Sequence, residues 1–148
     1  MDYGLKQEIL KLLDQLSEGH NGIQFNEAGK YWAINVKPIG KPRMTRRDRW
    51  AKRPAVERYW EMKDLLKKEV KQIQAQRLKL WYLFQPPKSW SKKRKEAVLG
   101  KPHLSKPDLD NLVKGTLDAL YEEDSVVYEI QAIKIWWLHS IIIIQEFE

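Results

Sequence analysis

Apolar residues in this chain recur with two different periods, and the two periods alternate along the sequence. Between residues 5 and 16, and again between 56 and 73, they return every three or four positions, which is typical of a helix with one buried face. Elsewhere they alternate with polar residues or form short unbroken runs, which is typical of strands. The predicted helices cover residues 4–18, 54–74, 91–99 and 110–120, and the predicted strands cover 30–37, 77–85, 126–138 and 140–147. This order predicts one small α/β (α+β) domain over residues 1–148, a mixed β-sheet flanked by helices, with residues 1–20 as an N-terminal helical extension.

The most apolar run, residues 133–144, does not fit a membrane span. Lys134 and the pair His139 and Ser140 interrupt it, and it is well short of the roughly 20 residues that cross a bilayer. The N-terminal residues carry acids and lysines at helical spacing and lack the apolar stretch of a signal peptide. The absence of cysteine excludes disulfides and thiolate zinc sites. We therefore expect a cytoplasmic protein with no membrane partner.

The positive charge of the chain is concentrated in two segments. The whole sequence has a formal net charge of +7, whereas residues 37–53 alone carry +7 and residues 88–106 carry +6, which leaves −6 on the remainder. Both segments are punctuated by proline and glycine, and segregated charge of this kind is typical of proteins that bind a phosphate backbone. A solvated lysine-rich surface, or a localisation signal in the first segment, is the simpler alternative.

Residues 106–125 have the opposite character. Six acids lie between residues 108 and 124, with Lys114 as the single cation among them. Asp110, Lys114 and Asp118 follow at steps of four and share one helix face. The apolar residues, at steps of three and four, predict a buried stripe on the other face. These are Leu109, Leu112, Val113, Leu117 and Leu120. Clustered acids repel one another unless something positive neutralises them.

Asp108 and Asp110 could converge on one ion only if Asp108 lies outside the helix. Two residues apart within a regular helix they would point about 200° from each other. Pro107 and an aspartate at the helix start make an extended Asp108 plausible, with Asp110 in the first turn. Two convergent carboxylates suit Mg²⁺, which prefers oxygen ligands. Ordinary helix capping and dipole complementation explain the same residues without a metal, and on spacing alone both interpretations stay open.

The segment KPDLDNLVKGTLDAL, followed by EEDS and by Lys134 in a strand, and preceded by GKPRMTRR, resembles the RusA family of Holliday junction resolvases. These are small dimeric Mg²⁺-dependent endodeoxyribonucleases of bacteria and their phages. The resemblance spans about residues 40–134, and the N-terminal helix falls outside it. It implies a RusA-like fold and an enzyme that acts on branched DNA, such as four-way junctions, in recombination and repair. It also implies Mg²⁺ as the cofactor, with Mn²⁺ as a possible substitute.

The resemblance also implies roles for individual residues. Asp108, Asp110 and Asp124 would be metal ligands and catalytic residues, with Glu123 as the alternative third acid, and Lys114 would be the catalytic cation. An i,i+4 ion pair with Asp110 is the alternative role for Lys114. The basic segments would then hold the DNA backbone, because the acids alone would repel it. The expected phosphate contacts are Lys41, Arg43, Arg46, Arg47, Arg49, Lys92, Lys93 and Arg94.

The position of Asp124 raises a geometric difficulty. A regular helix from Asp110 to Leu120 separates its ends by roughly 15 Å, and four further residues return at most about 14 Å. A shared site therefore requires a shortened helix, a chain that doubles back at once, or an acid from a partner subunit. A homodimer fits the last option and also suits a twofold junction cut by paired nicks. The competing functions are a noncatalytic DNA-binding module and a basic adaptor for another acidic partner.

Overall fold

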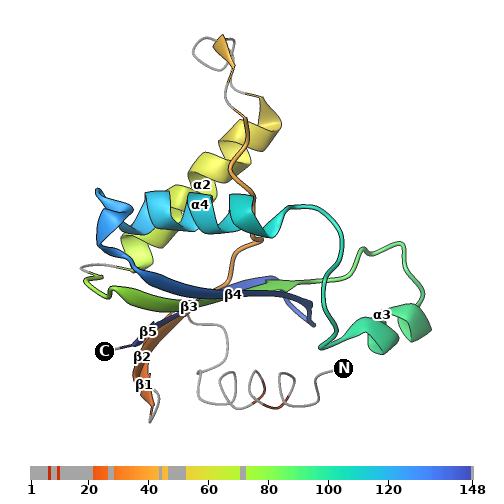
Figure 1. Ribbon diagram of the computed structural model, residues 1–148. Coiled ribbons are helices and arrows are strands. Elements are labelled where there is room, and N and C mark those ends of the chain that lie inside the picture. The colour runs from red at the N-terminus through yellow and green to blue at the C-terminus, as the bar shows by residue number, and fades with distance from the viewer. Residues whose placement is uncertain are drawn as a thin grey trace.

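The computed structural model describes residues 7, 10, 22–26, 29–43, 45–46, 53–70 and 73–147, which form a five-stranded sheet in the order β1-β2-β5-β3-β4 (Figure 1). The strands are β1 (Gly22–Asn26), β2 (Gly29–Ile34), β3 (Arg77–Phe84), β4 (Glu129–Trp136) and β5 (Ile141–Phe147). β3 and β4 run parallel, whereas the pairs β1-β2, β2-β5 and β3-β5 are antiparallel. The predicted mixed sheet is therefore confirmed.

β5 lies between β2 and β3, and apolar side chains cover it on both faces. Ile142, Ile143 and Ile144 are fully buried, and Ile141 is 6% exposed. Successive strand residues point to opposite faces, so an unbroken apolar run suits a strand that is buried on both sides. The run of isoleucines thus forms the centre of the sheet.

Two helices cover one face of this sheet: α2 (Pro54–Glu69) and α4 (Leu109–Leu120) (Figure 1). Pro54 occupies the first turn of α2, where its missing N–H costs no hydrogen bond. The prediction that this helix continues to residue 74 is wrong, because Val70 leaves the helical conformation with φ −104° and ψ 85°. Val70 and Ile73 are nevertheless buried, so the buried apolar residues continue beyond the end of the helix.

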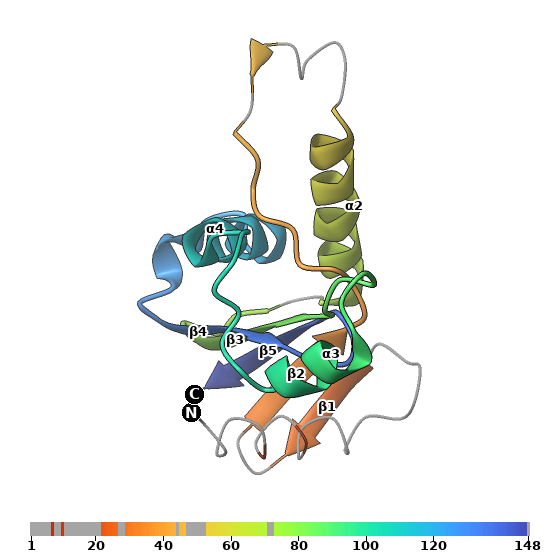
Figure 2. The same ribbon diagram turned by 90° about the vertical axis from the view of Figure 1, so that its right-hand side faces the viewer.

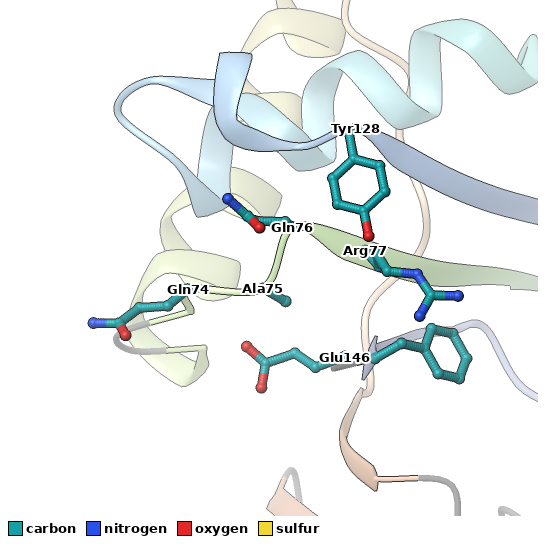
Figure 3. Close-up of a pocket in the computed structure, with 7 residues that line it drawn as sticks. Gln74, Ala75, Gln76, Arg77, Tyr128 and Glu146 are labelled. Carbon is teal, nitrogen blue, oxygen red and sulfur yellow. The ribbon is translucent and has the colours of Figure 1, made fainter.

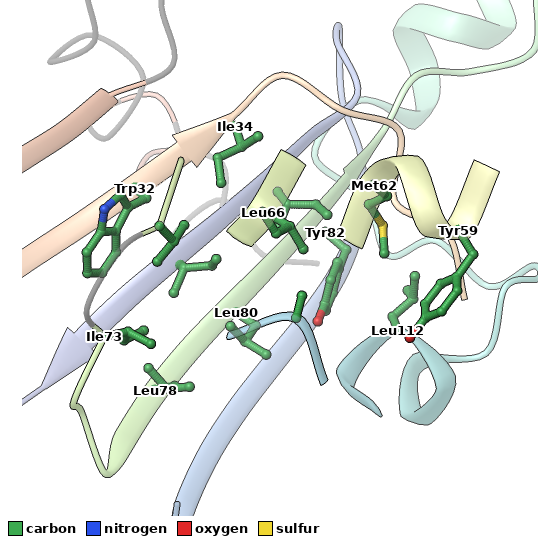
Figure 4. Close-up of a cluster of buried hydrophobic side chains, with 14 of the residues drawn as sticks. Trp32, Ile34, Tyr59, Met62, Leu66, Ile73, Leu78, Leu80, Tyr82 and Leu112 are labelled. Atoms are coloured by element: carbon green, nitrogen blue, oxygen red, sulfur yellow. The ribbon is translucent and has the colours of Figure 1, made fainter. Parts of the chain in front are cut away.

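The core beneath the two helices combines aromatic and aliphatic side chains from the sheet with residues of α2 and α4 (Figure 4). Trp32, Leu80 and Tyr82 come from the strands, and Met62 and Leu66 come from α2. All five are at most 2% exposed. This apolar layer fixes the position of both helices over the sheet.

The opposite face of the sheet carries a second apolar cluster that includes Tyr31, Trp81, Ile143 and Trp137. The indole N–H of Trp81 donates to Gln145 Oε1 at 2.7 Å, which satisfies both buried polar groups. Leu10 packs against this cluster and has helical backbone. Apart from Gln7 and Leu10, the predicted N-terminal helix lies outside the described residues.

The buried face of α4 is rotated from the predicted leucine stripe. Its buried residues are Leu112, Gly115, Thr116 and Ala119. The other predicted stripe residues are only partly buried against the core: Leu109, Val113, Leu117 and Leu120. Small residues occupy the centre of the interface because α4 packs closely against α2. The helix itself is confirmed almost to the residue.

Two contacts hold α4 in this orientation. A Cβ built on Gly115 would lie 2.9 Å from Cε2 of Tyr59, so the helix approaches the ring as closely as glycine allows. Thr116 Oγ1 donates to the carbonyl of Leu112 at 2.8 Å, and the Tyr82 hydroxyl lies 2.7 Å from Thr116 Oγ1. Burial raises the pKa of Tyr82 well above its usual value, so the hydroxyl keeps its proton and can donate. The hydrogen bond ties α4 to β3.

Other strands also depart from prediction. β1 is absent from the predicted strands, and β2 begins one residue early and ends at Ile34 rather than residue 37. Asp124–Val126 forms a short 3-10 helix, η2, so β4 begins at Glu129 instead of residue 126. The short helix predicted at 91–99 is confirmed as α3 (Lys92–Val98). No helix among the described residues is long and apolar enough to span a bilayer.

Replacing Gly115 with alanine should destabilise the fold. The added methyl would meet the buried ring of Tyr59, and overpacking of this kind costs about 1–3 kcal/mol, partly offset by about 1 kcal/mol of helix propensity. Urea denaturation measures the change in the free energy of unfolding. Lys114→Ala, on the exposed face of the same helix, is the control and should stay within about 0.5 kcal/mol of wild type. A Gly115→Ala protein more stable than wild type would contradict the close contact.

Candidate active site

Asp108 and Asp110 lie at the N-terminal end of α4 in the arrangement that convergence requires. Asp108 is the N-cap residue with extended backbone, φ −68° and ψ 140°, and Asp110 lies in the first helical turn. Both side chains are exposed. The side chain of Asp108 makes no capping hydrogen bond, although its carbonyl accepts from Leu112 N at 3.2 Å. The Asp108 carboxylate is therefore not used as a helix cap.

Lys114 lies one turn after Asp110 on the exposed face of α4. Within the described part of the chain, Lys114 and Asp110 form no ion pair with each other. The alternative role for Lys114, an i,i+4 partner of Asp110, is therefore not observed. The ammonium faces solvent.

Among the residues that the structure describes, the acid of α4 that forms an ion pair is Asp118, two turns after Asp110. Its Oδ2 lies 2.5 Å from Nζ of Lys41, and both side chains are partly exposed. The hydrogen bond to Asp118 raises the pKa of Lys41, and the charge of Asp124 adds to this effect. Lys41, predicted as a DNA contact, is thus also an internal partner of α4. The local sequence pattern gave no sign of this pair.

The first basic segment passes close to α4 and then extends away from the sheet (Figure 2). The backbone N–H of Lys41 donates to the carbonyl of Asn111 at 3.2 Å. A Cβ on Gly40 would lie 3.2 Å from Cβ of Pro107, so this passage also needs a small residue. Arg53 Nη2 donates to the carbonyl of Arg43 at 2.9 Å and links the two sides of the segment.

The structure describes only some of the arginines that are predicted to contact DNA in the first basic segment. Arg43 and Arg46 are exposed. Arg47 and Arg49 lie outside the described residues.

The second basic segment contains α3. Ser91 caps this helix by accepting from Arg94 N at 3.2 Å. Lys92, Lys93 and Arg94 are exposed, and the Arg94 guanidinium lies 3.6 Å from the ring centroid of Trp90. A stacked guanidinium keeps its charge and its outward donors. This helix can therefore present cations to a phosphate backbone.

The chain between α3 and α4 follows the outer edge of β4. Gly100 N donates to Trp136 O at 2.9 Å, Trp136 N donates to Lys101 O at 3.0 Å, and His103 N donates to Lys134 O at 3.0 Å. The sheet edge thus guides the chain from the basic helix to the acidic end of α4 (Figure 1).

The His103 ring is buried between Phe84 and Trp136, at centroid distances of 4.3 and 4.1 Å. Its Nδ1 has no hydrogen-bond partner among the described residues. Burial lowers the pKa of His103, and the nearby charge of Lys134 lowers it further. The ring is therefore neutral in the folded protein near pH 7.

The structure does not bring the third predicted acid to the first two. Asp124 begins η2, beyond the C-terminal end of α4, and its side chain is exposed. The neighbouring Glu123 accepts a hydrogen bond from Ser125 N at 3.4 Å. Among the described residues, no group of three histidine, aspartate or glutamate side chains could hold a metal ion. The assignment of Asp124 therefore stays a prediction.

A cavity of about 320 Å³ lies at the opposite end of β3 from this site (Figure 3). Gln76, Arg77, Tyr128 and Glu146 are among its lining residues, and none of the predicted site residues is. Arg77 forms an ion pair with Glu129 nearby. The cavity is thus separate from the acidic end of α4.

Comparison with known families places most of the chain in one of them. The family model described as endodeoxyribonuclease RusA matches residues 34–145, which include both basic segments and all of α4. A search of curated proteins gave no match.

Acid should destabilise the fold through His103. Because its folded pKa is lowered, the unfolded chain takes up a proton more readily, and the stability that the neutral ring contributes is lost as the pH falls below about 6.5. His103→Phe should remove this part of the pH dependence. Urea denaturation of both proteins from pH 8 to pH 5 measures it. If the difference in the free energy of unfolding between the two proteins does not change with pH, this would contradict a neutral buried ring.

Proposed function

The chain belongs to the RusA family of endodeoxyribonucleases, and we propose that it is a Mg²⁺-dependent, structure-selective enzyme that resolves Holliday junctions and other branched DNA by paired nicks during recombination and repair. One observation carries this proposal. Two exposed carboxylates, Asp108 and Asp110, lie at the start of α4. One strongly cationic segment contacts this helix, and the other leads into it along the chain.

The donor set at this end of α4 fits a hard divalent cation. Asp108 and Asp110 offer carboxylate oxygens, and Mg²⁺ is commonly held by one or two carboxylates together with water and substrate phosphates. Neither carboxylate is committed to a hydrogen bond or ion pair within the described residues. Bound there, Mg²⁺ or Mn²⁺ would activate water and offset charge on the phosphate.

Lys114 would supply the second positive charge of the reaction. Its ammonium stands on the same exposed face of α4 as Asp110, one turn further along. From this position it would donate to a phosphate oxygen or to the developing oxyanion. Lys114 forms no ion pair with an acid in the described part of the chain, so it would break none there to do so.

The two basic segments would deliver the DNA backbone to these acids. Arg43 and Arg46 in the first segment, and Lys92, Lys93 and Arg94 on α3, are exposed and can contact phosphates. Arg47 and Arg49 belong to the same proposed set. Lys41 would contribute through the long-range field more than through contact, because Asp118 holds its ammonium.

The third acid would come from a second subunit. α4 is a regular helix of 12 residues, so the shortened helix that would bring Asp124 back is not observed. Within the described residues no third acid gathers with two others, so a chain that doubles back to complete the site is not observed either. A homodimer would let Asp124, or the adjacent Glu123, complete the site of its partner. Twofold symmetry would also present two equivalent sites to the two strands of a four-way junction.

The scattered acids favour one competing function. A noncatalytic DNA-binding module needs the cationic segments but no ion, and within the described residues three carboxylates do not gather. Such a module would bind junctions and leave them uncut.

Asp110→Asn should reduce junction cleavage in Mg²⁺ by about a hundredfold or more, because the amide is a poor ligand for the ion. Cleavage of a labelled four-way junction, beside a linear duplex, measures the loss. Asp64→Asn, an exposed acid on α2, is the matched control and should cut at the wild-type rate. Full activity of Asp110→Asn would remove the catalytic proposal. A wild-type chain that binds junctions tightly without cutting them would favour the noncatalytic module.

Mixed dimers should reveal which subunit supplies Asp124. Asp110→Asn and Asp124→Asn should each be inactive alone, since every site then lacks one ligand. If the acid acts across the dimer, a heterodimer of the two variants contains one intact site and should nick the junction on one strand. If both acids act within one subunit, the heterodimer stays inactive, which would contradict the proposal. Light scattering of the purified heterodimer confirms twice the mass of one chain.

A further inference from the structure

Lys134 reaches from β4 to the turn that leads into α4. Its Nζ donates to the carbonyl of Ser105 at 2.6 Å and to the carbonyl of Pro107 at 2.8 Å. The side chain is partly buried. An ammonium that donates to two carbonyls fixes their separation, and hydrogen bonds from a charged donor are stronger than neutral ones. The turn is therefore held from the sheet side.

This side-chain contact begins where the backbone contact with β4 ends. The chain follows the strand edge through Pro102, which bridges to Ile135, and through the hydrogen bond from His103 N to Lys134 O. After His103 the backbone leaves the edge. Lys134 thus contacts His103 through its carbonyl, and Ser105 and Pro107 through its ammonium.

The first basic segment contacts the same turn. Gly40 lies so close that an added Cβ would be 3.2 Å from Cβ of Pro107 and 3.4 Å from Cβ of Asn111. Lys41 N donates to Asn111 O. Pro107 is therefore fixed by Lys134 through its carbonyl and by Gly40 through packing.

Asp108 depends on this turn more than Asp110 does. Asp110 is placed by the helix, whereas Asp108 has extended backbone and no side-chain capping bond. The backbone of residues 105–108 therefore sets where its Cβ points, and so the region that the carboxylate can reach. Groups that orient a metal ligand commonly change metal affinity or activity by about 10–100-fold when removed.

We propose that Lys134 is a positioning residue for the metal site: its ammonium holds the carbonyls of Ser105 and Pro107 and so presents the Asp108 carboxylate to the ion. This inference rests on the proposed function. Lys134 itself contacts neither ion nor substrate in this role.

Lys134→Met tests the proposal because methionine keeps an unbranched stem and removes the donors and the charge. Lys79→Met, a partly buried lysine on the adjacent strand β3, is the matched control. We expect the Mg²⁺ concentration for half-maximal junction cleavage to rise about tenfold or more in Lys134→Met, with the rate at saturating Mg²⁺ within about threefold of wild type. Junction affinity in EDTA should stay within about twofold for both variants.

Amide hydrogen exchange gives a readout that needs no metal and no cleavage. In Lys134→Met, exchange should accelerate about tenfold or more in peptides covering residues 104–108 and stay unchanged in β3 and β5. Lys79→Met should leave residues 104–108 unchanged.

Three results would overturn the positioning role. Unchanged exchange would mean that Lys134 does not hold the turn. A lower rate at saturating Mg²⁺ with an unchanged half-saturating concentration would indicate a general structural role. A lower half-saturating concentration would mean that removal of the positive charge outweighs any loss of position. A wild-type chain that never cuts DNA would remove the proposed function itself. Faster exchange in Lys134→Met would then still show that Lys134 holds the turn, because this measurement does not depend on cleavage.

Discussion

The close approach of α4 to α2 at Gly115 governs the geometry of the acidic site. With no Cβ at this position, α4 can rest against the ring of Tyr59, and the neighbouring Thr116 can hydrogen-bond to Tyr82 in the sheet. A larger residue would force the helix away from both partners. Because a helix is rigid, fixing its middle also fixes its end. Asp110 and Lys114 consequently face solvent, while the small residues between them and α2 are buried.

Charge in this protein is separated, but it is also partly balanced within the fold. The pair formed by Lys41 and Asp118 joins the first basic segment to the later half of α4. Its partly exposed setting makes it a weak source of stability, since exposed pairs contribute about 1 kcal/mol or less. Its greater effect is on the distribution of charge. It neutralises one acid of α4 and leaves Asp108 and Asp110 as the carboxylates at the other end.

The outer edge of β4 connects the second basic segment to the same site. Aromatic rings from Phe84 through His103 and Trp136 to Trp90 follow one another at centroid distances of 4.1 to 5.1 Å. Trp90 in turn carries the guanidinium of Arg94. The core, the edge of the sheet and the basic helix are thus one packed unit. A DNA backbone bound to α3 would meet the acids of α4 in a fixed relation, as precise positioning of a phosphate requires.

Periodicity along the chain predicted four of the described strands, the helix at residues 110–120 and the extended Asp108 before it, because these depend mainly on neighbours within a few residues. The same local pattern placed the end of α2 too late and chose the wrong centre for the buried face of α4, since apolar residues fill the core whether or not they are helical. It could not reveal that Lys41 pairs with Asp118, 77 residues away, or that Lys134 holds the turn at residues 105–107. The sequence by itself determined most of the described helices and strands, though not β1, and it also determined where charge concentrates and which family the chain resembles. Only the tertiary structure decided which side chains meet, because contacts between distant segments depend on how closely whole elements can pack.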